Sequence, residues 1–202
     1  MKGMRRRLAY LLILPLARLL FWLFEVISLK EMSHGIRIID FLATDETDSR
    51  VKLVDRALAV VESHSPALLR RMRRNLRAIV IVRTRTEYAE GRRLCLLNFL
   101  ELDSGSPAEV ALSLAHETTH AVIEAAGIPY RKEKRSRIER ACVRAELRLA
   151  TRIGDAELVD RTKKTMGLVW WEDDQMRAVR ENEWRAVGTP EWLLRVMRFL
   201  RG

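Results

Sequence analysis

The sequence is poor in cysteine, glycine and proline, with 2, 9 and 5 of these residues in 202. So few cysteines exclude a disulfide scaffold, and so little glycine and proline excludes collagen-like and low-complexity chains. Cys95 and Cys142 lack metal-ligand spacing such as C-x-x-C, and their apolar neighbours favour buried thiols over the one disulfide they could form. Because no repeat or Gly- or Ser-rich linker divides the body of the chain, we expect one globular domain there.

Acidic residues are outnumbered, with 27 Asp and Glu against 37 Lys and Arg and a net charge of +10. Such a surface attracts anionic partners: nucleic acid, lipid headgroups or acidic protein. The densest cluster is five arginines between residues 70 and 77, after a helix start at Ser65-Pro66. We interpret it as a solvated helix face, with an anionic partner as the alternative. No aromatic residue is interleaved and no nucleic-acid-binding motif occurs, so nucleic acid is not an expected partner.

Residues 8–29 form an apolar run of about the length that spans a bilayer, behind a basic stretch at residues 2–7. Arg18 and Glu25 interrupt the run and fall on one helix face. We predict a membrane anchor within residues 1–32, ahead of a domain at residues 33–202. The excess of basic residues before the run favours a single-pass protein with a cytoplasmic N-terminus and the domain outside. The alternatives are a packed or interfacial helix, peripheral on the cytoplasmic face, and a cleaved signal peptide.

Hydrophobic periodicity predicts the elements of the domain. Val51, Val54, Leu58 and Val61 recur at helical spacing within residues 44–63. Continuous apolar runs predict strands at residues 78–82 and 94–100, with residues 88–91 as a loop. Further helices are expected at residues 66–74, 106–126, 132–151, 155–166, 172–186 and 190–201. The fold class is therefore α+β, mostly helical with a small sheet.

The strongest signal is an HExxH motif, His116-Glu117-Thr118-Thr119-His120. Its helix begins with a capping box at Ser106 and is otherwise apolar or small on every side, so the motif lies in or beside the core. Residues four apart share a helix face, which lets both imidazoles converge on one zinc ion. Glu117 lies one step round, where it can accept a proton from a water that the ion activates. The alternative is two core histidines that happen to fall four apart.

A catalytic zinc usually has a third protein ligand, and the next helix offers acids for it. Glu139 and Glu146 share with Cys142 the helix face that can turn inward, whereas Arg137, Arg140, Arg144 and Arg148 form another face. Both acids are candidates. Glu124 also follows His120 at helical spacing, but it is two turns from His116 and cannot close a compact site.

These residues resemble the zincin metallopeptidases of the glutamate-ligand group, over about residues 65–151. Residues 116–150 also look like uncharacterised, often membrane-anchored bacterial HExxH proteins. The resemblance implies zinc held by His116, His120 and Glu139, since eighteen residues separate His120 from Glu139 as in some branches of that group. It also implies a small sheet whose edge strand binds an extended substrate, a role that the run at 94–100 fits.

One departure from the group concerns the acid that some members carry one turn after the glutamate ligand, because Val143 stands there. The third ligand therefore stays open between Glu139 and Glu146, with Glu146 as the alternative ligand or a residue that orients a histidine. For the group that stabilises the developing oxyanion we expect Tyr130 first and Arg137 second.

The resulting hypothesis is a zinc-dependent hydrolase, in which Glu117 activates water to cleave peptide bonds of a peptide or protein substrate. The alternative is a non-catalytic, zinc-stabilised module that binds membrane or protein through its basic surface. Both hypotheses share the metal, so only activity that depends on Glu117 separates them. The oligomeric state is not indicated by the sequence.

Overall fold

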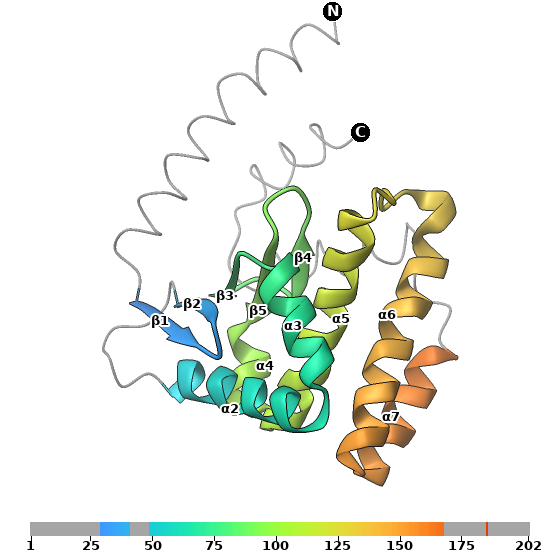
Figure 1. The fold of residues 1–202 in the computed structure, drawn as a ribbon. Coiled ribbons are helices and arrows are strands. Elements are labelled where there is room, and N and C mark those ends of the chain that lie inside the picture. Colours follow the sequence, from blue (N-terminus) through green and yellow to red (C-terminus); the bar gives the residue numbers. More distant parts are fainter. Residues whose placement is uncertain (1–28, 41–48, 168–184, 186–202) are drawn as a thin grey trace, which may run out of the picture.

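The computed structural model describes residues 29–40, 49–167 and 185. It confirms an α+β fold with a small sheet (Figure 1). The strands are β1 (Leu29–Ser33), β2 (Ile36–Asp40), β3 (Ala78–Val82), β4 (Glu87–Ala89) and β5 (Leu94–Asn98). The helices are α2 (Ser49–His64), α3 (Pro66–Asn75), α4 (Phe99–Ser104), α5 (Pro107–Ala125), α6 (Lys132–Ile153) and α7 (Ala156–Met166).

The five strands form one sheet in the order β1-β2-β3-β5-β4. The three inner strands are parallel, and β1 and β4 pair antiparallel at the two edges. The central strand β3 is covered on both faces and is apolar throughout. A continuous apolar run is typical of such a strand, so its bounds could be predicted from the sequence. The larger core lies between the sheet and helices α2, α3 and α5, where it buries Ile79, Ile81 and Leu97.

The strand expected at residues 94–100 is wrong in two respects. It ends at Asn98, whose side chain accepts a hydrogen bond from Leu100 N and caps α4. It also lies between β3 and β4, so it is not the edge strand. The edge is β4, which includes part of the segment predicted as a loop. A three-residue strand of Glu, Tyr and Ala carries no apolar run, so hydrophobic patterning misses it.

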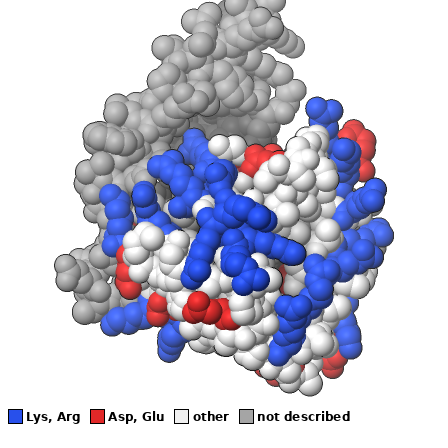
Figure 2. All heavy atoms as spheres, in the orientation of Figure 1, with Lys and Arg blue, Asp and Glu red and all other residues white. Residues whose placement is uncertain are grey.

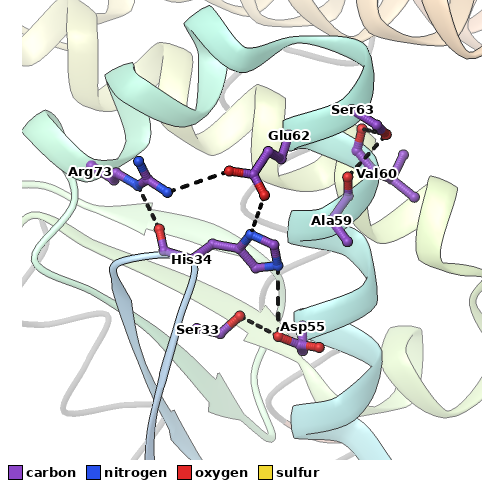
Figure 3. Close-up of polar contacts among 8 residues, drawn as sticks. All are labelled: Ser33, His34, Asp55, Ala59, Val60, Glu62, Ser63 and Arg73. Atoms are coloured by element: carbon purple, nitrogen blue, oxygen red, sulfur yellow. Dashed lines mark hydrogen bonds and ion pairs between the residues drawn. The ribbon is translucent and has the colours of Figure 1, made fainter.

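The hairpin of β1 and β2 was also not predicted, and its first strand begins within the predicted anchor range of residues 1–32. Its tight turn has positive φ at His34 (49°) and Gly35 (74°), which a two-residue hairpin loop requires. Polar contacts join this turn to α2 and α3 (Figure 3): His34 Nδ1 lies 2.8 Å from Glu62 Oε2, and Arg73 Nε donates to the His34 carbonyl at 2.6 Å. The hairpin is hard to predict because His-Gly is a weak turn signal and because Lys30 and Glu31 of β1 are exposed.

Most of the predicted membrane anchor lies outside the described residues, as do the helices expected beyond residue 167. Among residues 29–40 and 49–167, no helix combines the length and the apolar character that crossing a bilayer requires.

The helix that carries the HExxH motif begins as predicted. Ser106 N donates to Glu109 Oε2 at 2.7 Å, and Glu109 N donates to Ser106 Oγ at 3.2 Å, which completes a capping box. The Ser106 backbone and the Arg161 side chain lower the pKa of Glu109. Because the folded pKa is the lower one, this contribution to stability is present above the ordinary pKa of glutamate and is lost as pH falls through the lowered value.

Ser106→Ala is therefore expected to lower the free energy of unfolding by about 1 kcal/mol, because it removes the cap of α5. Urea unfolding followed by circular dichroism measures this difference. Ser63→Ala is the matched control, since the Ser63 hydroxyl donates only to carbonyls of the preceding turn of α2. An equal effect of the two substitutions would contradict a special role for the cap.

Candidate metal centre

Helix α5 places the two histidines of the motif one turn apart, with their side chains partly buried. Their Nε2 atoms lie 3.2 Å from each other, and the ring centroids are 5.0 Å apart. Residues four apart on a helix allow this approach, but they do not enforce it. The structure thus directs both imidazoles of the motif to one point.

Helix α6 brings a carboxylate to the same point. Gly127, with φ at +73°, ends the turn after α5, and α6 returns along it. Glu139 is 7% exposed, with Oε2 at 3.2 Å from His116 Nε2 and Oε1 at 3.6 Å from His120 Nε2. As predicted, the face of α6 with Glu139, Cys142 and Val143 is buried, whereas Arg137, Arg140, Arg144 and Arg148 are exposed.

These three side chains fit a zinc ion. In a tetrahedral site with zinc–nitrogen and zinc–oxygen bonds of about 2.0–2.2 Å, neighbouring donor atoms are about 3.3–3.4 Å apart. The two Nε2 atoms are 3.2 Å apart, and Glu139 lies at 3.2 Å from His116 through Oε2 and at 3.6 Å from His120 through Oε1, so its carboxylate faces both imidazoles at close to that spacing with a different oxygen for each. Two imidazoles and one carboxylate are also a donor set that catalytic zinc uses.

Glu146 occupies a different position from Glu139. Its Oε1 contacts Nδ1 of His116, on the side of the ring away from the other donors. Such a contact fixes the ring with its proton on Nδ1 and leaves Nε2 free to bind a metal. Burial lowers the pKa of His116, but the contacts with Glu139 and Glu146 outweigh it and raise this pKa well above its ordinary value. Glu146 therefore lies where a residue that orients His116 should be, two turns after Glu139 instead of one.

Glu117 lies beside the two histidines and is 6% exposed. Burial raises the pKa of its carboxyl group, although His116 and His120 oppose the shift. A raised pKa brings the group closer to neutral pH, where a general base works best. Glu117 also lines an open cleft of about 830 Å³ together with His116, His120 and Glu139.

Two further residues line the cleft near these groups. Tyr130 donates a hydrogen bond to Glu139 Oε1, and its ring lies edge-on to His120 at 5.4 Å between centroids. Burial and the Glu139 carboxylate raise the pKa of its hydroxyl, so Tyr130 stays a hydrogen-bond donor. Arg85 also lines the cleft, which sequence reasoning missed, because nothing in the sequence distinguishes it from the many other arginines. Arg137, the second expected oxyanion group, is exposed and does not line the cleft.

Cys142 is a second residue that sequence reasoning did not assign to the site. It is a free, fully buried thiol, and burial raises its pKa. Its sulfur and one ring nitrogen from each of His116 and His120 all lie within 4.8 Å of one another. The sequence did indicate this position, because Cys142 follows Glu139 by three residues and therefore lies on the same inward face of α6.

The edge strand β4 is fastened to the motif helix by Glu124. This carboxylate accepts hydrogen bonds from the Tyr88 hydroxyl and from Gly91 N, the latter at 2.7 Å. Tyr88 and Ala89 line the cleft, so the contact sets the distance between strand and cleft floor. Glu124 thus has a structural role, in agreement with its exclusion as a ligand.

Comparisons of the chain with known protein families, with curated proteins and with solved structures find no match.

Proposed function

We propose that this protein is a zinc-dependent hydrolase of the zincin type that cleaves peptide bonds. The observation that carries the proposal is the convergence of His116, His120 and Glu139 at zinc-binding spacing on the floor of an open cleft, with the buried acid Glu117 beside them. Two helices supply these groups, so chance proximity along one helix does not account for them.

In this proposal His116, His120 and Glu139 hold the ion, and Glu146 holds the ring of His116 in orientation. Bound zinc would lower the pKa of a coordinated water towards neutrality and polarise the substrate carbonyl. Glu117 accepts the proton of the attacking water and passes it to the leaving amine. The Tyr130 hydroxyl, which donates to Glu139 in the structure, would transfer its hydrogen bond to the oxygen that gains negative charge. Arg85 also lines the cleft, where its Nε pairs with Glu87 Oε2 at 3.0 Å.

Strand β4 favours an extended peptide as the substrate. It forms the sheet edge beside the cleft and pairs only with β5 among the described strands. Backbone groups on such an edge can pair with an extended chain, which would lay a scissile peptide bond along the cleft. We therefore propose for β4 the substrate-binding role that the resemblance implied for residues 94–100.

Removal of the metal is the direct test of the proposal. The protein stripped with a chelator is expected to cleave no member of an unbiased peptide library, and activity should return with about one zinc per chain. Elemental analysis and mass spectrometry of the products measure the two quantities. A wild-type protein that carries one zinc per chain and cleaves no peptide would contradict the proposal.

Tyr130→Phe is expected to lower kcat by about 10- to 100-fold with little change in KM, because it removes the hydroxyl that would donate to the oxyanion; zinc content is measured alongside, since the same hydroxyl contacts Glu139. Steady-state kinetics on a peptide identified in the library provides the measurement. Thr151→Val is the control, since the Thr151 hydroxyl donates to the Leu147 carbonyl within α6 and does not line the cleft. A change in KM alone for Tyr130→Phe would assign this hydroxyl to substrate binding.

A second candidate function is favoured by the basic surface. Arginines of α3 and α6 gather on one face of the molecule (Figure 2), and those of residues 70–74 are all exposed. A zinc-stabilised module could bind an acidic protein or a membrane through this face. Such a module needs the metal for stability but does not need Glu117, which separates the two candidates.

A further inference from the structure

The thiol of Cys142 is a metal-ligating group that the proposed hydrolysis does not use. It is 0% exposed and does not line the cleft, whereas both histidines and Glu139 do. Its sulfur nevertheless belongs to a compact group with a ring nitrogen from each histidine, all within 4.8 Å. The thiol therefore approaches the metal centre from the protein interior, and a substrate approaches it from the cleft.

The distances allow the sulfur to become a ligand with little movement. In a tetrahedral site with a zinc–sulfur bond of about 2.3 Å, a sulfur and a nitrogen donor are about 3.6 Å apart. The sulfur lies within 4.8 Å of the nitrogens, which is at most about 1.2 Å more than that spacing, and rotation about the Cα–Cβ bond moves a cysteine sulfur further than this. Thiolate is also among the ligands that zinc prefers.

We propose that Cys142 is a fourth protein ligand, and that the site alternates between an open form held by His116, His120 and Glu139 and a closed resting form in which the thiolate also binds the ion. This proposal rests on the proposed function, because it assumes that the two histidines bind zinc. Closure would exchange the S–H bond for a sulfur–metal bond, and both the thiol proton and the water held at the fourth position would leave to solvent through the cleft. Four protein ligands leave no open position, so the closed form retains zinc and is inactive.

Cobalt substitution tests the proposal without an activity assay. Co²⁺ in a tetrahedral site gives visible ligand-field bands, and a bound thiolate adds a charge-transfer band in the near ultraviolet. The full chain loaded with Co²⁺ is expected to show both features. Cys142→Ser and Cys142→Ala should keep the visible bands and lose the near-ultraviolet band. Cys95→Ala is the matched control, because Cys95 is equally buried but lies in β5 outside the group, and it should keep both features.

If the Cys142 variants do not fold, two other measurements test whether Cys142 binds the metal. Zinc should slow alkylation of Cys142 in the wild-type protein by at least about 10-fold more than it slows alkylation of Cys95, because zinc stabilises the whole fold around both buried thiols but ligates only Cys142. Glu139→Ala with excess Co²⁺ should keep the near-ultraviolet band, since the thiolate and both imidazoles remain. Absence of protection, or of the band in wild-type and Cys95→Ala proteins, overturns the role of Cys142.

The cobalt spectra also separate failure of this proposal from failure of the proposed function. Visible bands without the near-ultraviolet band overturn the closed form and leave the metal site in place. Absence of all cobalt bands removes the metal site, and with it both proposals. A near-ultraviolet band in a protein that hydrolyses nothing would support Cys142 as a ligand and indicate that the closed form is the permanent one.

Discussion

Glu117→Gln is expected to lower kcat/KM for peptide hydrolysis by about 10²- to 10⁴-fold while zinc remains bound, because an amide keeps the shape of the side chain but cannot accept a proton. The carboxyl group lies beside the metal-binding atoms without being one of them, so the metal content should not change. Kinetics on a library-derived peptide, together with elemental analysis of the same sample, provides the measurement.

Glu133→Gln is the matched control for this substitution, since Glu133 is an exposed acid in the first turn of α6. It should leave both activity and zinc unchanged. If Glu117→Gln retains full activity at full zinc occupancy, Glu117 is not the base, and the hydrolase mechanism proposed for this site is wrong. If the variant also keeps its cellular role, the zinc-stabilised binding module becomes the better hypothesis.

Helix α5 could be predicted from the sequence because local signals agree there. The capping box at Ser106, the apolar side chains and the turn at Gly127 each depend on residues close together in the chain. The same holds for the buried strand β3. The edge strands β1 and β4 escaped prediction because they are short, mix polar with apolar residues and become strands only through pairing with a neighbour. Strand β2 was also missed, although Ile36, Ile38 and Ile39 give it an apolar pattern of strand length.

The candidate site likewise contains some residues that the sequence alone predicts and others whose roles depend on tertiary packing. His116, Glu117 and His120 lie within one motif, whereas the choice between Glu139 and Glu146 depends on how α6 packs against α5. Both acids lie on one face of α6, seven residues apart, and periodicity alone treats them alike. The packing places Glu139 at the Nε2 atoms and Glu146 at Nδ1 of His116. The proximity of Cys142 to the imidazoles likewise depends on tertiary packing.

The double substitution His116→Ala, His120→Ala is expected to reduce bound zinc from about one ion per chain to none, because it leaves Glu139 as the only remaining ligand of the open form. The reduction should be accompanied by a lower melting temperature of the zinc-treated protein, since binding stabilises the folded state. His64→Ala is the control, because the His64 ring contacts the Arg152 carbonyl away from the cleft. Undiminished zinc in the double variant would place the metal elsewhere.

Single substitutions of the two acids should then rank them. Glu139→Ala removes a carboxylate whose Oε2 lies 3.2 Å from His116 Nε2 and whose Oε1 lies 3.6 Å from His120 Nε2, so zinc affinity should fall by more than about 100-fold. Glu146→Ala removes only the partner of His116 Nδ1, where losses of about 10- to 100-fold are typical. Competition with a chromophoric chelator measures both affinities. The reverse order would assign the third ligand to Glu146, and it would require the His116 ring to turn so that Nδ1 faces the ion.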